Sequence, residues 1–254
     1  MKLFYREVGE TGQPIVILHG LFGSSDNWFT QAKMLADNHK VYLIDQRNHG
    51  QSPHSDEFNY DTLADDLREF LVSNNILNPI LIGHSLGGKT AMKFATTNPE
   101  SLSKLIVVDI APKTYPVKHD GILEGLKALP IDSIKSRNEA DQLLAEYVEE
   151  PNVRQFLLKN LQRTPEGGFT WKINIPVLDQ NIESVGEGII GLKKFDKPTL
   201  FIRGLHSDYI EDADMGYIKT IFPQANLVTL ETGHWVQAER PVEFVEVVNK
   251  FLAA

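Results

Sequence analysis

The chain has 254 residues, 42% of them hydrophobic and 23% charged, which is the composition of a folded globular protein and excludes a disordered one. Its formal net charge is −9, so little counterion release would accompany binding to a polyanion, and we expect no nucleic-acid partner. It contains no cysteine, which excludes disulfides, thiolate metal sites and a cysteine nucleophile.

The first 111 residues alternate short apolar strands with helical patterns. Residues 2–8 alternate between apolar and polar side chains, which predicts an edge strand. Continuous apolar strands are predicted over residues 14–18, 40–44, 79–82 and 104–108. Helices are predicted between them, over residues 28–36, 61–72 and 86–97. Because unalternating strands separated by helices form parallel sheets covered on both faces, the pattern predicts an α/β fold.

The pattern changes after residue 112 and returns near residue 195. In the intervening stretch, helices are predicted over residues 119–128, 137–148 and 152–161. Afterwards we expect strands over residues 198–202 and 226–230, and helices over residues 212–222 and from Pro241 onward. We therefore predict one domain whose core is formed by residues 1–111 and 195–254. Residues 112–194 would form a helical cap insertion over the carboxyl edge of the sheet, where open α/β sheets bind ligands.

No segment of the chain predicts a membrane or targeting role. Apolar runs such as residues 15–18 are four residues long, whereas a membrane-spanning helix needs about 20. The first residues carry charges at Lys2, Arg6 and Glu7 with no apolar stretch after them, so no secretory signal is predicted. We expect a cytoplasmic protein without membrane association, and its oligomeric state stays open.

One segment, from Gly83 to Thr90 (GHSLGGKT), matches two catalytic patterns. Its first five residues are G-x-S-x-G, the nucleophile elbow, in which Ser85 would stand on a sharp turn between a strand and a helix. The whole segment is also G-x-x-x-x-G-K-T, the phosphate-binding loop of an NTPase, with Lys89 as phosphate ligand. Both patterns follow a strand and precede a helix, so residues elsewhere in the chain must decide which interpretation is correct.

The turn after an early strand favours the nucleophile elbow. His19-Gly20 stands where a serine hydrolase places one backbone N–H of its oxyanion hole. The two donors would then be the N–H groups of Leu21 and Leu86, with Phe22 as the alternative to Leu21.

His234 also favours the nucleophile elbow. His234 follows the last predicted strand, at the edge of the sheet from which it could accept the proton of Ser85. An NTPase needs neither this histidine nor the earlier turn. We therefore favour the elbow, and Lys89 is expected to be an ordinary polar residue on the helix.

Five motifs occur together and in order: HGLFGS at residues 19–24, D-x-R-x-x-G-x-S at 45–52, GHSLGGK at 83–89, VDIAP at 108–112 and GHW at 233–235. This set resembles the α/β-hydrolase superfamily, and more narrowly its small carboxylesterase/thioesterase branch, which carries R-N-H-G and V-D-I-A-P. The resemblance implies the α/β-hydrolase fold, acyl transfer through a serine without metal or organic cofactor, and a small acyl ester or thioester as substrate. A non-catalytic ligand receptor on the same fold stays an alternative, since a fold does not fix a function.

Two carboxylates compete to orient His234. Asp109 ends the strand after the elbow helix, whereas Asp208 follows the strand where most family members place their acid. At the position where the family's spacing after Gly204 places the acid, this chain has Ser207, and Asp208 follows one residue later. In the branch with V-D-I-A-P, the acid follows the earlier strand. We therefore predict Asp109 as the acid. Ser207 would fill the vacated position and hydrogen-bond to His234 or Asp109.

Substrate choice is expected to lie in the cap and at the mouth of the site. Aromatic side chains there are candidates for an apolar acyl pocket, principally Phe22, Trp28, Tyr115, Phe156 and Trp235. Because the predicted cap helices are short, we expect a short-to-medium acyl chain.

The remaining polar residues of the motifs are expected to be structural. Asp45 and Arg47 are expected to act as a charged pair in a turn, which usually organises loops, and His49 and His84 are expected to hydrogen-bond locally. No metal site is predicted, because the chain has no H-E-x-x-H sequence and no carboxylate cluster with ligand spacing.

Overall fold

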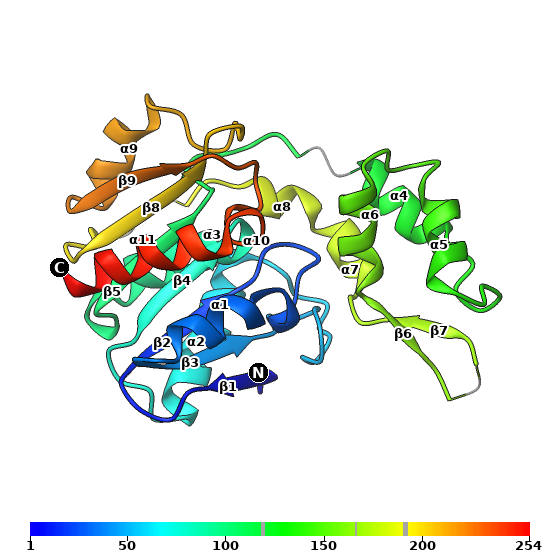
Figure 1. Cartoon of the computed structure of the whole chain (residues 1–254), viewed down its shortest axis with the longest axis horizontal. Helices are drawn as coiled ribbons and strands as arrows, with labels where there is room; N and C mark the ends of the chain where they lie inside the picture. The colour runs from blue at the N-terminus through cyan, green and yellow to red at the C-terminus, as the bar shows by residue number, and fades with distance from the viewer. Residues whose placement is uncertain (118–119, 166, 190–192) are drawn as a thin grey trace.

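The computed structural model describes residues 1–117, 120–165, 167–189 and 193–254. A seven-stranded sheet runs through the molecule in the order β1-β3-β2-β4-β5-β8-β9 (Figure 1). β1 is antiparallel to β3, and the other neighbouring strands are parallel. The strands are β1 (Tyr5–Val8), β2 (Gln13–Leu18), β3 (His39–Ile44), β4 (Ile80–His84), β5 (Lys104–Val108), β8 (Thr199–Gly204) and β9 (Ala225–Leu230). The predicted fold class, a mostly parallel α/β sheet, is confirmed.

The central strands are hydrophobic along their length because both of their faces are buried. Side chains alternate between the faces, so Leu81 and Val107 join the hydrophobic cluster on one side, and Ile82 and Ile106 join the cluster on the other. All four are fully buried, and Ile82 pairs with Ile106 in the parallel register of β4 and β5. This two-sided burial explains the absence of polar alternation in the sequence.

Helices cover the two faces of the sheet (Figure 1). α2 and α3 contribute to the first cluster, and α1 and α11 contribute to the second. The side chain of Asn59 accepts a hydrogen bond from the backbone N–H of Thr62 and caps the start of α2. The core helices are the 3-10 turn η1 (Ser25–Trp28), α1 (Phe29–Leu35), α2 (Tyr60–Ser73), α3 (Leu86–Thr97), the 3-10 turn η2 (Pro99–Ser101), α9 (Asp214–Ile221), α10 (Val236–Glu239) and α11 (Pro241–Ala253).

The insertion between β5 and β8 lies to one side of the sheet domain (Figure 1). It contains α4 (Asp120–Ala128), α5 (Arg137–Leu144), α6 (Pro151–Leu158), the hairpin strands β6 (Leu161–Arg163) and β7 (Phe169–Trp171), α7 (Ile175–Gln180) and α8 (Ile182–Gly186). The predicted helix start at His119 falls outside the described residues. The division of the chain at residues 112 and 194 stays a prediction.

The β6–β7 hairpin was not predicted, and the helix expected over residues 152–161 ends at Leu158. Each strand of the hairpin is three residues long, which is too short for alternation to be recognised in the sequence. Leu161 and Phe169 are buried by the insertion, so packing rather than local pattern selects strand geometry here.

Asparagine side chains join the insertion to the core. The side-chain amide of Asn160 donates to the carbonyl of Phe22 over 2.8 Å, and that of Asn174 donates to the side-chain oxygen of Asn48 over 3.1 Å. The backbone N–H of Asn174 also donates to the carbonyl of Asn48. These bonds hold the insertion directly above the loops that follow β2 and β3.

Candidate active site

Ser85 stands on a strained turn between β4 and α3. Its φ of 52° and ψ of −117° lie in a region that residues with a side chain rarely adopt. The glycines on either side make the turn possible, because a Cβ at Gly83 would lie 2.2 Å from the carbonyl oxygen of Gly87. A Cβ at Gly87 would lie 2.4 Å from the carbonyl oxygen of Leu18. The G-x-S-x-G spacing is therefore a steric requirement of this turn.

Asp109 and His234 meet at the carboxyl edge of the sheet. The Nδ1 atom of His234 lies 2.8 Å from Oδ2 of Asp109, which is fully buried after β5. Asp109 also accepts hydrogen bonds from the backbone N–H of Gly204, over 2.9 Å, and from the hydroxyl of Ser207. Three donors thus stabilise the carboxylate, and Nδ1 of His234 is fixed as the protonated nitrogen.

The competing carboxylate, Asp208, is exposed and makes no hydrogen bond to His234. Ser207 occupies the position next to His234 but donates to Asp109 rather than to the imidazole. The structure therefore brings together Asp109, Ser207 and His234, and leaves Asp208 at the surface.

Two aromatic rings enclose the imidazole of His234. Nε2 of His84 donates to the carbonyl oxygen of His234 over 2.9 Å, and the ring centroids are 4.6 Å apart. Burial lowers the pKa of His84 well below its ordinary value, so this ring is neutral. The ring of Tyr209 stacks on the imidazole of His234, with ring centroids 4.2 Å apart and an angle of 26° between the ring planes. Sequence analysis did not single out Tyr209, because no motif contains it.

The loop after β2 approaches the turn at Ser85. A Cβ at Gly20 would lie 3.3 Å from the Cβ of Ser85. The N–H of Phe22 donates to Nε2 of His49 over 3.2 Å, whereas the N–H of Leu21 donates to none of the described residues. Leu86 is the first residue of α3, where an N–H has no acceptor within the helix. Leu21 and Leu86 therefore carry uncommitted donors beside the turn.

Two buried histidines hold this loop. Burial lowers the pKa of His19 to about 4, and burial together with the neighbouring His19 lowers that of His49 to about 3, so both are neutral near pH 7. Nε2 of His19 accepts from the backbone N–H of Gln46, and Nδ1 of His49 donates to the carbonyl of Arg47. His49 thus forms the predicted local hydrogen bond, to Arg47, and also fixes the backbone of Phe22, which is remote in the sequence.

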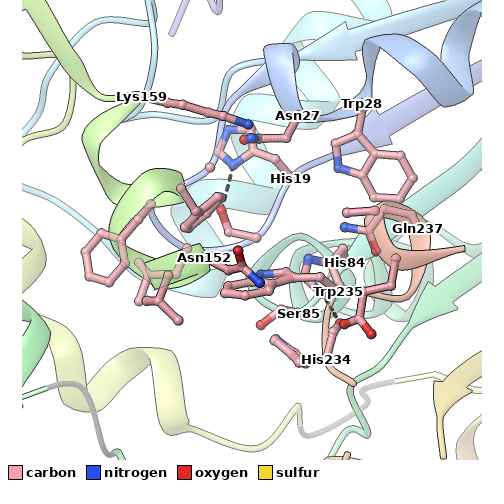
Figure 2. Close-up of a pocket in the computed structure, with 18 of the residues that line it drawn as sticks. His19, Asn27, Trp28, His84, Ser85, Asn152, Lys159, His234, Trp235 and Gln237 are labelled. Carbon is pink, nitrogen blue, oxygen red and sulfur yellow. Dashed lines mark hydrogen bonds between the residues drawn. The ribbon is translucent and has the colours of Figure 1, made fainter. Parts of the chain in front are cut away.

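A cavity of about 570 Å³ opens beside Ser85 and His234 (Figure 2). Core and insertion both line it. Its walls include four of the five aromatic residues predicted for the pocket, namely Phe22, Trp28, Phe156 and Trp235. Tyr115 does not line it. The hydroxyl of Tyr115 instead accepts from the N–H of Ala111 and donates to the carbonyl of Tyr209, so this side chain ties two loops together.

The comparisons with known proteins agree with this geometry. A model of the alpha/beta hydrolase fold matches residues 13–132. The sn-1-specific diacylglycerol lipase ABHD11 of Mus musculus is 38% identical over 94% of this chain and 80% of its own length. The chain belongs to the α/β-hydrolase family. Esterase YbfF of Escherichia coli is 37% identical, over 94% of this chain and 92% of its own. The solved structure of a marine microorganism esterase has a TM-score of 0.96 and 45% identity, over 98% and 99% of the two chains.

In this α/β hydrolase, Lys89 is not the ordinary polar residue of the helix that the sequence suggested, because its side chain is only 1% exposed. Its ammonium group donates to the carbonyl oxygens of Val185, Gly186 and Glu187 at the end of α8. These bonds hold the insertion on the nucleophile helix. They also leave the ammonium group facing protein carbonyls rather than a phosphate, which argues against the NTPase reading.

Stability of this α/β hydrolase is expected to depend on Lys89 above pH 8. Burial lowers the pKa of Lys89 from 10.5 to about 8, so between these values the unfolded chain binds more protons and stability rises with pH. Lys89→Met removes this contribution. Urea unfolding at pH 7.5, 8.5 and 9.5 should show wild-type stability rising relative to the variant by up to about 1.4 kcal/mol per pH unit. Parallel pH profiles of the two proteins would contradict this.

Two further properties of the α/β hydrolase concern the described residues only. No helix among them has both the length and the hydropathy of a membrane-spanning segment. Within the same residues, His, Asp and Glu side chains form no cluster of three or more that could hold a metal ion.

Proposed function

We propose that the chain is a serine esterase that cleaves short-to-medium-chain carboxylic esters or thioesters through an acyl-enzyme on Ser85. The observation that carries the proposal is the 2.8 Å contact between His234 and Asp109 at the wall of the cavity that Ser85 also lines. The names of the relatives, an esterase and a diacylglycerol lipase, support ester hydrolysis.

The first step is acyl transfer to the enzyme. As Oγ of Ser85 attacks the carbonyl carbon of the substrate, Nε2 of His234 accepts the serine proton. Asp109 stabilises the imidazolium that forms, and its bonds to Gly204 and Ser207 hold the carboxylate in place. His234 then donates the proton to the departing alcohol or thiol.

Negative charge develops on the carbonyl oxygen during this attack. The N–H groups of Leu21 and Leu86 are the donors we assign to that oxygen, and each such donor lowers a barrier by about 3 kcal/mol. The bond from Phe22 to His49 supports Leu21 over Phe22 as the first donor, because the N–H of Phe22 is committed elsewhere.

The second step returns the enzyme to its starting state. His234 accepts a proton from water, the resulting hydroxide attacks the acyl carbonyl, and the carboxylic acid leaves as Ser85 regains its proton. Both steps use only the substrate, water and the residues already named, and every proton passes between these groups.

A fluorophosphonate probe tests the proposal directly. The wild type should become labelled at Ser85, located by mass spectrometry of peptides, and should hydrolyse p-nitrophenyl acetate and butyrate. Ser85→Ala should lose the label and at least about 10⁴-fold in kcat. Ser101→Ala, at an exposed serine of η2, is the matched control and should behave as wild type. A wild type that is neither labelled nor active would leave the non-catalytic receptor as the better reading.

A further inference from the structure

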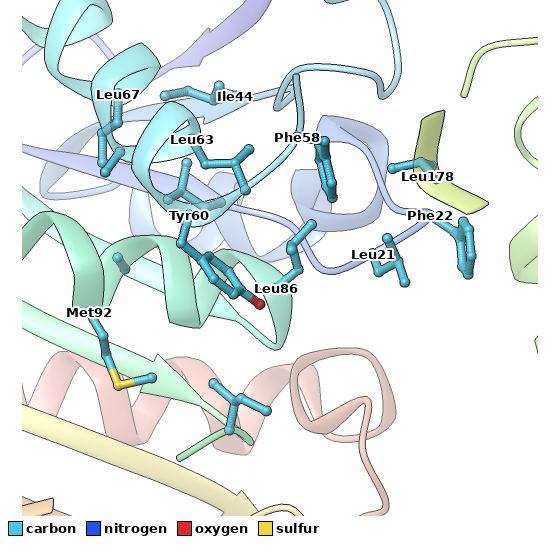
Figure 3. Close-up of a cluster of buried hydrophobic side chains, with 14 of the residues drawn as sticks. Leu21, Phe22, Ile44, Phe58, Tyr60, Leu63, Leu67, Leu86, Met92 and Leu178 are labelled. Carbon is cyan, nitrogen blue, oxygen red and sulfur yellow. The ribbon is translucent and has the colours of Figure 1, made fainter. Parts of the chain in front are cut away.

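The insertion and the core line different parts of the cavity, and the insertion makes its end the more apolar one. With Phe22, the apolar side chains there are Ile122, Val153, Phe156 and Leu157, and the same segments add the polar side chains of Asn152, Gln155 and Lys159. The other end is formed by two core segments, residues 26–31 and 235–241, and is rich in polar side chains. Figure 3 shows that Leu21 and Phe22 are part of the buried hydrophobic cluster of the core. Phe22 therefore connects this cluster with the apolar end of the cavity. The apolar end suits an acyl chain, which leaves the polar end for the other half of an ester.

Three polar side chains of the core end are buried, and the two glutamines among them are incompletely bonded. Trp28, Gln31 and Gln237 are 1%, 3% and 4% exposed. The side-chain oxygens of both glutamines have no donor among the described residues. The amide nitrogen of Gln31 donates to the backbone carbonyl of Gln237, so the two unpartnered oxygens belong to side chains of residues that are joined to each other.

These side chains face a common space. All three line the cavity, and Figure 2 shows Trp28 and Gln237 on the same side of it. Buried polar atoms without partners are rare in proteins, because they lose their bonds to water without replacement. The two unmet acceptors, the side-chain oxygens of Gln31 and Gln237, therefore indicate a place for polar atoms of a ligand.

The charges of the lining indicate an uncharged ligand group. Asp26, Glu239 and Lys159 line the cavity. The carboxylate of Asp26 pairs with Arg6 over 2.7 Å, so its charge is compensated, whereas Glu239 forms no ion pair with a described residue. An anionic ligand group beside residues 235–241 would therefore be repelled by Glu239.

We propose that Trp28, Gln31 and Gln237 form a subsite for a neutral, hydroxyl-bearing alcohol half of the substrate. A hydroxyl group can accept from the indole N–H and donate to an amide oxygen, and rotation of the Gln237 amide exchanges its donor and acceptor. The inference rests on the proposed esterase activity and narrows the class of substrates. Esters of polyols are preferred over thioesters whose thiol half carries phosphate groups.

A matched pair of substrates tests the subsite. Glycerol 1-monobutyrate and propyl butyrate share the acyl group and the three-carbon alcohol skeleton, and they differ by two hydroxyl groups. We expect wild-type kcat/KM to be about tenfold higher for the glycerol ester. Gln237→Leu should lower this ratio at least fivefold. Gln224→Leu, at an exposed glutamine between α9 and β9, should leave both the rates and the ratio at wild-type values.

The outcomes separate the subsite from the esterase proposal. Equal kcat/KM for the two esters in the wild type, or a ratio unchanged by Gln237→Leu, would overturn the subsite while leaving the esterase intact. Absence of hydrolysis and of probe labelling at Ser85 would overturn the proposed function itself. Trp28→Phe gives a second measurement, since it removes the N–H and keeps a ring against Phe244, 5.7 Å away. If circular dichroism shows that this variant is unfolded, the kcat/KM ratio of the two esters for Gln237→Leu alone tests the subsite.

Discussion

Asp109→Asn should lower kcat for p-nitrophenyl butyrate about 10⁴-fold. An asparagine keeps the shape of the side chain but not its charge, so it no longer stabilises the imidazolium of His234 and favours the wrong tautomer of the ring. The effect should be large because the carboxylate is fully buried and lies 2.8 Å from Nδ1. Steady-state kinetics with matched active-site concentrations measure it.

Asp208→Asn is the matched control for this prediction. Asp208 is exposed and forms no hydrogen bond with the imidazole of His234, although it directly follows Ser207, which donates to Asp109. Its variant should retain kcat within about twofold, as surface substitutions usually do. The reverse result, an inactive Asp208→Asn and an active Asp109→Asn, would contradict the proposed role of Asp109.

Asp66→Ala should cost about 3–5 kcal/mol of unfolding free energy, because it leaves the buried guanidinium of Arg47 without its carboxylate. Both side chains are nearly inaccessible, and the pair is bidentate, with distances of 2.6 Å and 3.0 Å. Urea unfolding monitored by tryptophan fluorescence provides the measurement.

The neighbouring residue supplies the control for the buried pair. Asp65 forms an ion pair with Arg68 on the same helix, but both side chains are more than half exposed. Asp65→Ala should therefore change stability by about 0.5 kcal/mol or less, since water and salt screen such pairs. Equal losses for Asp65→Ala and Asp66→Ala would show that burial does not set the strength of these interactions.

Local sequence patterns predicted the strands and helices of the core closely. β5 and α3 have the predicted bounds, residues 104–108 and 86–97, because a buried apolar run and a helical period each leave a clear signal. Patterns were less informative in the insertion. There, the β6–β7 hairpin is too short to show a period, and its strands form because Leu161 and Phe169 become buried.

The placement of Lys89 shows why side-chain environments were harder to predict. The sequence places this residue one turn after Ser85 on a helix, which is compatible with an exposed position, a phosphate ligand or a buried cation. Its acceptors, the carbonyls of residues 185–187, lie about a hundred positions away in the chain. No local pattern can reveal a partner that only folding brings close.

The sequence by itself determined the chemistry that this chain can carry: a serine flanked by the glycines that its strained turn requires, a histidine on a late loop, and an acidic residue after a strand. Those features are local, because they depend on backbone sterics and side-chain type. Only the tertiary structure brought Asp109 within 2.8 Å of His234, committed the N–H of Phe22 to His49 and joined Gln31 to Gln237. These choices depend on distances between segments remote in sequence, and packing of the whole sheet and its insertion sets those distances.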